Sequence, residues 1–218
     1  MAEPIMIVSG LPRSGTSMMM RILNAGGVEV VTDNLREADE DNPLGYFELE
    51  SVKSIHEDHS WLDEAHGRAL KMVSMLLYKL PPEHAYRVIF MRRDIDEILA
   101  SQRAMLQRKG ESANFDAGEM KSLFLKHLDE VLHWAARQPN FSVLEISYRS
   151  VIEDPQTVAL QIGGFLGKSL DMEAMVGVVN PALYRQRAAE SAPPVQAAPK
   201  NVQDNDKIEA QLRALGYM

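Results

Sequence analysis

The sequence predicts an α/β domain of three layers, in which helices cover both faces of a central parallel sheet. Two observations lead to this prediction. Short apolar runs rich in β-branched residues are typical of strands inside a parallel sheet. Longer stretches with apolar residues at helical spacing separate these runs. We expect strands at residues 5–8, 28–31, 88–91 and 143–146.

The first half of the chain predicts two helices and one ambiguous segment. A helix over residues 14–24 ends at Gly26-Gly27, and a second over 95–108 ends at Gly110, because glycine is a strong helix stop. Residues 71–75 are rich in methionine. This segment fits either a further strand or the start of a helix.

The second half predicts two more helices in the domain. Residues 119–137 carry apolar side chains at helical spacing before Pro139. Asp154-Pro155 is a favourable cap and first-turn pair, and an apolar stripe then continues to Gly167. The alternation of strands and helices predicts one domain over residues 1–187.

The C-terminal part differs in composition. Residues 188–200 are poor in large apolar side chains and are interpreted as a linker. Residues 201–218 are predicted to contain a final amphipathic helix, which docks on the domain or on a partner chain. The second arrangement would suit a homodimer.

Composition and charge exclude several classes of protein. The chain has 218 residues, no cysteine and a formal net charge of -8. A chain without cysteine has no disulfide scaffold, thiolate nucleophile or cysteine-based zinc site. The acidic balance argues against a general nucleic-acid binder. The apolar runs are too short for a secretory signal or for a membrane span of about 20 residues. We therefore expect a soluble, cytoplasmic protein.

The most specific local pattern follows the first predicted strand. Residues 5–17 combine an apolar run, a loop containing Gly10 and Gly15, and the start of a helix. Such a loop presents backbone N–H groups and a positive helix end to a phosphate. Thr16 stands where a nucleoside triphosphatase needs a lysine, and a basic residue comes earlier, at Arg13. Without that lysine, the pattern favours a phosphate ligand other than a triphosphate.

This loop resembles the 5′-phosphosulfate loop of the sulfotransferase family, whose donor is 3′-phosphoadenosine 5′-phosphosulfate (PAPS). The arginine version is similar to that of tyrosylprotein sulfotransferases and many bacterial members. The resemblance implies a P-loop-like fold, and it implies that the 5′-phosphosulfate is held by Arg13, Ser14, Gly15, Thr16 and Ser17.

Two further segments resemble the family in the expected order. Arg93 at the end of an apolar run, Ser101 eight residues later and the acidic Glu97 between them are similar to the 3′-phosphate motif. An arginine fork and a hydroxyl can together hold a phosphate dianion. Tyr148 resembles a family tyrosine that lies beside the nucleotide, although Arg149 replaces the usual glutamate.

The resemblance also implies candidates for the chemical step. Arg13 and Lys71 would stabilise charge on the transferring group, and a carboxylate would accept the proton of the acceptor. Val73 occupies the position of a histidine base in small-molecule enzymes of the family. Asp33, 20 residues after Arg13, is therefore the first candidate for the base. Glu37 and Glu48 are the others.

These patterns together predict a PAPS-dependent sulfotransferase. It would transfer a sulfuryl group to a hydroxyl or amine of a small-molecule, glycan or lipid acceptor and release adenosine 3′,5′-bisphosphate, without a metal. Two alternatives stay open at this stage. One is a P-loop kinase acting on a small molecule, and the other is a non-catalytic nucleotide-binding protein.

Overall fold

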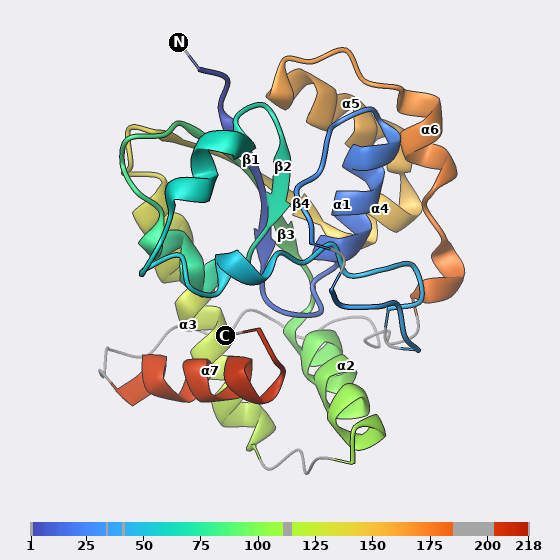
Figure 1. The fold of residues 1–218 in the computed structure, drawn as a ribbon. Helices are drawn as coiled ribbons and strands as arrows, with labels where there is room; N and C mark the ends of the chain where they lie inside the picture. The colour runs from blue at the N-terminus through green and yellow to red at the C-terminus, as the bar shows by residue number, and fades with distance from the viewer. Residues whose placement is uncertain (1, 34, 41, 111–114, 185–202, 218) are drawn as a thin grey trace.

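The core of the computed structural model is a four-stranded parallel sheet with strand order β2-β1-β3-β4 (Figure 1). The structure describes residues 2–33, 35–40, 42–110, 115–184 and 203–217. The strands are β1 (Ile5–Gly10), β2 (Ala69–Lys71), β3 (Tyr86–Arg92) and β4 (Phe141–Ser147). The predicted α/β sheet is confirmed.

Helices cover both faces of this sheet, as Figure 1 shows. One face packs against α1 (Thr16–Ala25), α4 (Tyr148–Glu153), α5 (Pro155–Leu166) and α6 (Met172–Gly177). The other face packs against α2 (Ile95–Arg108), α3 (Ala117–Ala135), α7 (Gln203–Ala214) and the 3-10 helices η1 (Glu50–Val52), η2 (Ser60–Ala65) and η3 (Ser74–Lys79). A fourth short helix, η4, spans Pro181–Leu183.

Strand β1 shows why the core has two halves. Ile5 and Ile7 belong to the cluster beneath α2 and α3, whereas Met6 and Val8 belong to the cluster beneath α1 and α5. Alternate side chains of a strand point to opposite faces, so a strand covered on both sides is apolar throughout. All six residues of β1 are buried.

The register of the central strands fixes the position of the loops that follow them. β1 pairs with β3 from Ile5 opposite Tyr86 to Gly10 opposite Met91. Both strands therefore end at the same edge of the sheet. The loop after β1 and the start of α2 after β3 lie next to each other for this reason.

The prediction of a strand over residues 28–31 is wrong, because this segment forms only an isolated β-bridge. Val30 forms a single parallel bridge with Ala69, and no longer pairing follows. β2 has only three residues, so it offers this segment a short partner. Thr32 then leaves the sheet, because its hydroxyl donates to the carbonyl oxygen of Glu48 at 2.9 Å.

The segment at residues 71–75, predicted as either a strand or the start of a helix, contains the end of one and the start of the other. Lys71 ends β2, and η3 begins three residues later at Ser74. The helix predicted over 95–108 has the bounds of α2, because the Asp94 carboxylate accepts hydrogen bonds from the first amides of that helix. Asp154 likewise caps α5 through the amide of Thr157.

Helix α7 docks on the same chain and crosses α3 (Figure 1). Its apolar residues Ile208 and Leu212 are buried in the core cluster on that face of the sheet. Lys126 of α3 forms an ion pair with Asp204 at 2.5 Å. In this structure α7 thus packs on the domain of its own chain. The homodimer stays a prediction, and the predicted linker at 188–200 lies outside the described residues.

None of the helices in the described parts of the chain is both long and apolar enough to cross a membrane.

Candidate active site

The loop between β1 and α1 needs glycine at two positions. Gly10 has φ 148° and Gly15 has φ 102°. A Cβ atom at Gly10 would lie 2.6 Å from Ser14 Oγ, and one at Gly15 would lie 2.5 Å from the ring of Tyr148. Neither distance is compatible with a side chain. The two glycines therefore let the loop fold tightly against Tyr148, the tyrosine predicted to lie beside the nucleotide.

The start of α1 is suited to bind an anion. The first amide groups of an α-helix have no acceptor within the helix. In α1, no side-chain hydrogen bond caps them either. The helix dipole adds partial positive charge at the same place. Ser14 Oγ is buried and has no hydrogen-bond partner among the described residues. An anion with several oxygen acceptors, such as a phosphosulfate, fits this set of donors.

Arg13 connects the loop to the segment that follows β3. Its backbone is in the left-handed region, at φ 76°, which is strained for a residue other than glycine. Arg93 Nη1 donates to the Arg13 carbonyl oxygen at 3.1 Å. Arg13 Nε donates to Ser101 Oγ at 2.9 Å. The residues predicted for the 5′-phosphosulfate and for the 3′-phosphate therefore meet.

Arg93 is held on two further sides. Its Nε donates to the buried carboxylate of Glu97 at 2.8 Å, and that carboxylate also accepts from the Tyr184 hydroxyl at 2.5 Å. The guanidinium lies 4.4 Å from the centroid of the Tyr148 ring. Charge pairing and ring stacking fix its orientation, so little conformational entropy is lost when it binds a phosphate.

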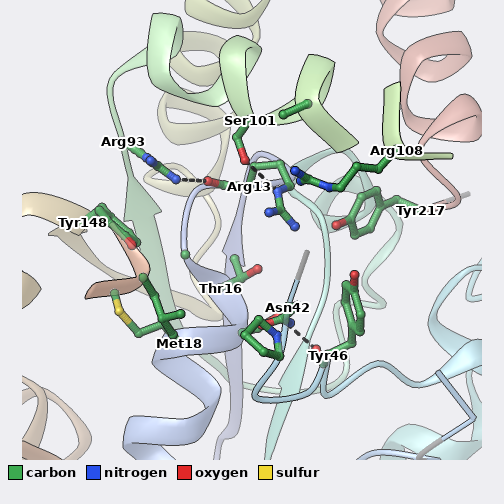
Figure 2. Close-up of a pocket in the computed structure, with 15 residues that line it drawn as sticks. Arg13, Thr16, Met18, Asn42, Tyr46, Arg93, Ser101, Arg108, Tyr148 and Tyr217 are labelled. Atoms are coloured by element: carbon green, nitrogen blue, oxygen red, sulfur yellow. Dashed lines mark hydrogen bonds between the residues drawn. The ribbon is translucent and has the colours of Figure 1, made fainter. Parts of the chain in front are cut away.

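A pocket opens beside these groups (Figure 2). Seven of the predicted site residues line it: Arg13, Gly15, Thr16, Ser17, Arg93, Ser101 and Tyr148. Figure 2 shows Arg93 and Tyr148 on one side, Tyr46 and Tyr217 on the other, and Arg13 between them. Ser14, within the loop, is fully buried and is not among the residues that line the pocket.

Lys71 lies behind the start of α1. Its Nζ is 3.3 Å from Ser17 Oγ and 3.0 Å from Glu48 Oε1, and it also donates to the Tyr46 carbonyl oxygen. Burial lowers the pKa of Lys71 to about 8, although the neighbouring Glu48 carboxylate opposes this shift. The structure thus brings Lys71 to the loop, as expected.

The three candidate carboxylates have different surroundings. Glu48 pairs with Lys71 and, at 3.1 Å, with Arg36. Asp33 accepts hydrogen bonds from the amides of Leu35 at 3.0 Å and Glu50 at 2.6 Å, so it stabilises the turn and the start of η1. Glu37 lines a second cavity, on the other side of Tyr46. Glu48 lines this second cavity as well, and none of the three carboxylates is among the described residues that line the first pocket.

Sequence reasoning missed several residues of this pocket. They are Tyr46, Arg108, Leu183 and Tyr217. The Arg36 guanidinium lies 3.5 Å from the Tyr46 ring centroid and 5.8 Å from that of Tyr217. Isolated tyrosines carry no local pattern. Only the docking of α7 brings Tyr217 near a loop some 200 positions earlier in the chain.

A chain of two hydrogen bonds connects α7 to the loop. Gln211 of α7 donates to the Gln102 side chain at 3.2 Å, and Gln102 donates to the Pro12 carbonyl oxygen at 3.3 Å. Both glutamines are buried. The C-terminal helix therefore supports the loop as well as carrying Tyr217 to the pocket.

The family of the chain follows from its sequence. The model of the sulfotransferase domain family matches residues 3–189, so the chain belongs to this family and is a sulfotransferase. PAPS is the usual donor in this family. No curated protein matches the chain.

Two solved structures of sulfotransferases are similar to this chain over most of its length. Sulfotransferase STF1 from Mycobacterium tuberculosis H37Rv is 16% identical with a TM-score of 0.52, over 100% of this chain and 78% of that one. The sulfotransferase domain from the curacin biosynthetic pathway is 13% identical with a TM-score of 0.49, over 97% and 98%. Because the sequence identity is low, the comparison with the mycobacterial protein shows a similar fold only.

The loop geometry makes a prediction for two glycine-to-alanine variants. Gly15→Ala should lower the free energy of unfolding by roughly 1–3 kcal/mol, because it adds backbone strain and a clash with Tyr148. Gly164→Ala, at an exposed position of α5 with no atom in the way, should raise it by up to about 1 kcal/mol. Urea unfolding measures both. Equal effects of the two variants would contradict the assigned loop geometry.

Proposed function

We propose that this sulfotransferase uses PAPS as donor and transfers its sulfuryl group to a hydroxyl or amine of a small-molecule acceptor. One observation carries the proposal. Arg13 and Arg93, from the ends of two neighbouring strands, meet with Ser101 beside the uncapped start of α1. This is a site with two separate positive groups, which suits a ligand with two separate anionic groups.

The same geometry supports a division of the donor site. Arg13, Ser14, Gly15, Thr16 and Ser17 would hold the 5′-phosphosulfate, where the helix amides and the unpartnered Ser14 hydroxyl lie. Arg93 and Ser101 would hold the 3′-phosphate. Tyr148 would lie beside the nucleotide, with its ring stacked against the Arg93 guanidinium.

Sulfuryl transfer needs positive charge near the leaving oxygen and a base for the acceptor proton. Bound PAPS would supply the sulfuryl group, and adenosine 3′,5′-bisphosphate would leave as the bond from sulfur to its 5′-phosphate oxygen breaks. Arg13 lies in the loop, and Lys71 contacts Ser17 in the first turn of α1, so these two cations would stabilise the charge on the leaving oxygen. Of the three candidate carboxylates, we assign the base to Glu48, since it contacts Lys71. This choice replaces Asp33, whose two oxygens serve the local fold.

The acceptor would bind on the side of the pocket formed by Tyr46 and Tyr217. These rings lie across the pocket from Arg93 and Tyr148 (Figure 2). Arg36 lies against Tyr46 and holds Glu48 at 3.1 Å, so the proposed base is close to this wall. Burial raises the pKa of Tyr217, which keeps its hydroxyl protonated and suits it to contact the acceptor as a hydrogen-bond donor.

No observation favours a kinase. Thr16 occupies the lysine position of a triphosphate loop. Among the described residues that line the pocket there is no aspartate or glutamate of the kind that holds magnesium beside a triphosphate. Membership of the sulfotransferase family points the same way.

The proposed base makes a prediction for two matched variants. Glu48→Gln should reduce turnover about 10²- to 10⁴-fold, as expected when a general base is removed. Asp33→Asn should keep turnover close to that of the wild type and lower the free energy of unfolding by about 1 kcal/mol, because it weakens a turn and a cap. Release of adenosine 3′,5′-bisphosphate from PAPS, with a panel of phenols, alcohols and amines, measures turnover.

One control and one opposite outcome make this comparison decisive. Affinity for adenosine 3′,5′-bisphosphate should be unchanged in Glu48→Gln, which separates loss of the base from loss of the fold. Loss of turnover in Asp33→Asn with full activity in Glu48→Gln would reverse the assignment.

The lowered pKa of Lys71 makes a prediction for the pH dependence. Lys71 is charged below about pH 8 and loses its proton as the pH rises through that value. The rate at low donor concentration should therefore fall above about pH 8 in the wild type. In Lys71→Arg the fall should disappear, because arginine stays charged at these pH values. Lys79→Arg, at an exposed lysine of η3, is the matched control and should keep the wild-type profile. An alkaline fall that persists in Lys71→Arg would assign it to another group.

A further inference from the structure

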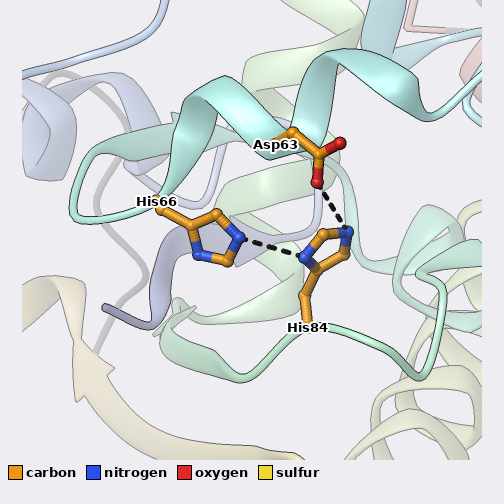
Figure 3. A group of neighbouring side chains, drawn as sticks. All are labelled: Asp63, His66 and His84. Carbon is orange, nitrogen blue, oxygen red and sulfur yellow. Dashed lines mark hydrogen bonds and ion pairs between the residues drawn. The ribbon is translucent and has the colours of Figure 1, made fainter. Parts of the chain in front are cut away.

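A cluster of three side chains lies at the opposite end of the sheet from the pocket. Asp63 belongs to η2, His66 follows that helix, and His84 lies two residues before β3. Figure 3 shows the three side chains directed toward one another. One ligand atom from each lies within 4.8 Å of the other two. The proposed sulfuryl transfer uses none of them.

The backbone fixes the proton on one of the two rings. His66 Nδ1 is 2.7 Å from the carbonyl oxygen of Glu3, which can only accept a hydrogen bond, so Nδ1 carries the proton. His66 Nε2 then has a lone pair, which faces His84 Nδ1 at 3.2 Å. Histidines that bind metals are commonly oriented in this way, by a hydrogen bond from the other nitrogen to a carbonyl.

His84 Nε2 and the Asp63 carboxylate then both act as hydrogen-bond acceptors, with no proton between them. When His84 Nδ1 donates to His66, the His84 Nε2 lone pair faces the Asp63 carboxylate, with the two atoms 3.9 Å apart. Two acceptors that face each other favour a cation between or beside them. Two basic side chains on adjoining segments are paired with other carboxylates, Lys168 with Glu3 at 2.7 Å and Arg68 with Glu29 at 2.8 Å.

We propose that Asp63, His66 and His84 bind a divalent transition metal of the zinc class. Two imidazoles and one carboxylate form a typical donor set for zinc. The 3.2 Å between the facing nitrogens is close to the roughly 3.3 Å edge of a tetrahedral site with bonds of about 2.0–2.1 Å. On binding, His84 changes tautomer through solvent: its proton moves from Nδ1 to Nε2, so that a neutral imidazole presents the Nδ1 lone pair to the metal.

The exposure of the ligands is consistent with a site that admits an ion from solvent. The His84 side chain is 12% exposed and is held by its contacts, whereas that of Asp63 is 80% exposed. Asp63 can therefore approach the metal without repacking the core. Bound metal would tie η2 and the segment before β3 to the N-terminal segment at Glu3, and it would stabilise the fold.

Calorimetric titration of Zn²⁺ into the untagged, EDTA-stripped full chain tests this site. We expect one strong site per chain, a rise in melting temperature with Zn²⁺, and visible absorption bands of tetrahedral Co²⁺ when that ion is used as a probe. His84→Gln should weaken Zn²⁺ binding at least about tenfold. His133→Gln is the matched control, because His133 lies 3.7 Å from Asp129 on an exposed surface with no third ligand among the described residues. It should leave binding unchanged.

A second variant guards against a folding defect in His84→Gln. Asp63→Asn changes an exposed side chain, so it should fold normally and still weaken Zn²⁺ binding. Absence of a strong site in the wild type, or equal Zn²⁺ affinity in the wild type, His84→Gln and Asp63→Asn, would overturn the proposal.

Discussion

The hydrogen bond from the Arg93 guanidinium to the Arg13 carbonyl oxygen is the interaction on which the pocket depends. It joins the loop after β1 to the start of α2 after β3, and it stabilises a residue whose backbone is strained. Parallel pairing of the two strands brings these segments to one edge of the sheet. Glu97 and Tyr148 then fix the arginine that makes the bond.

The rest of the pocket is built outward from this contact. Gly15 leaves room for Tyr148 against the loop, and Lys71 joins Ser17 to Glu48 on the opposite side. The final helix supports the loop through buried glutamines and adds Tyr217 as a wall. The proposed donor site thus lies at one end of the sheet, whereas the histidine cluster lies at the other end.

Local patterns were sufficient to predict the elements that carry their own signals. The end of α2 follows from Gly110, and the tight loop after β1 follows from its two glycines after a buried strand. Residues 28–31 have the composition of a strand, but pairing depends on the length of the partner, which composition does not reveal. Spacing from Arg13 favoured Asp33 over Glu48, yet only the folded chain shows which carboxylate contacts Lys71. Tyr217 depends on the docking of α7, a tertiary contact.

Arg13 and Arg93 are proposed to form a donor site for a ligand with two anionic groups. Calorimetric titration of adenosine 3′,5′-bisphosphate with EDTA present, beside ATP with magnesium, tests it most directly. We predict binding of the bisphosphate that weakens roughly 10- to 100-fold in Arg93→Ala, as expected for lost hydrogen bonds to a charged group. Arg92→Ala, which removes an exposed arginine paired with Glu145, should bind as the wild type does. Binding of ATP with magnesium but not of the bisphosphate would contradict the account.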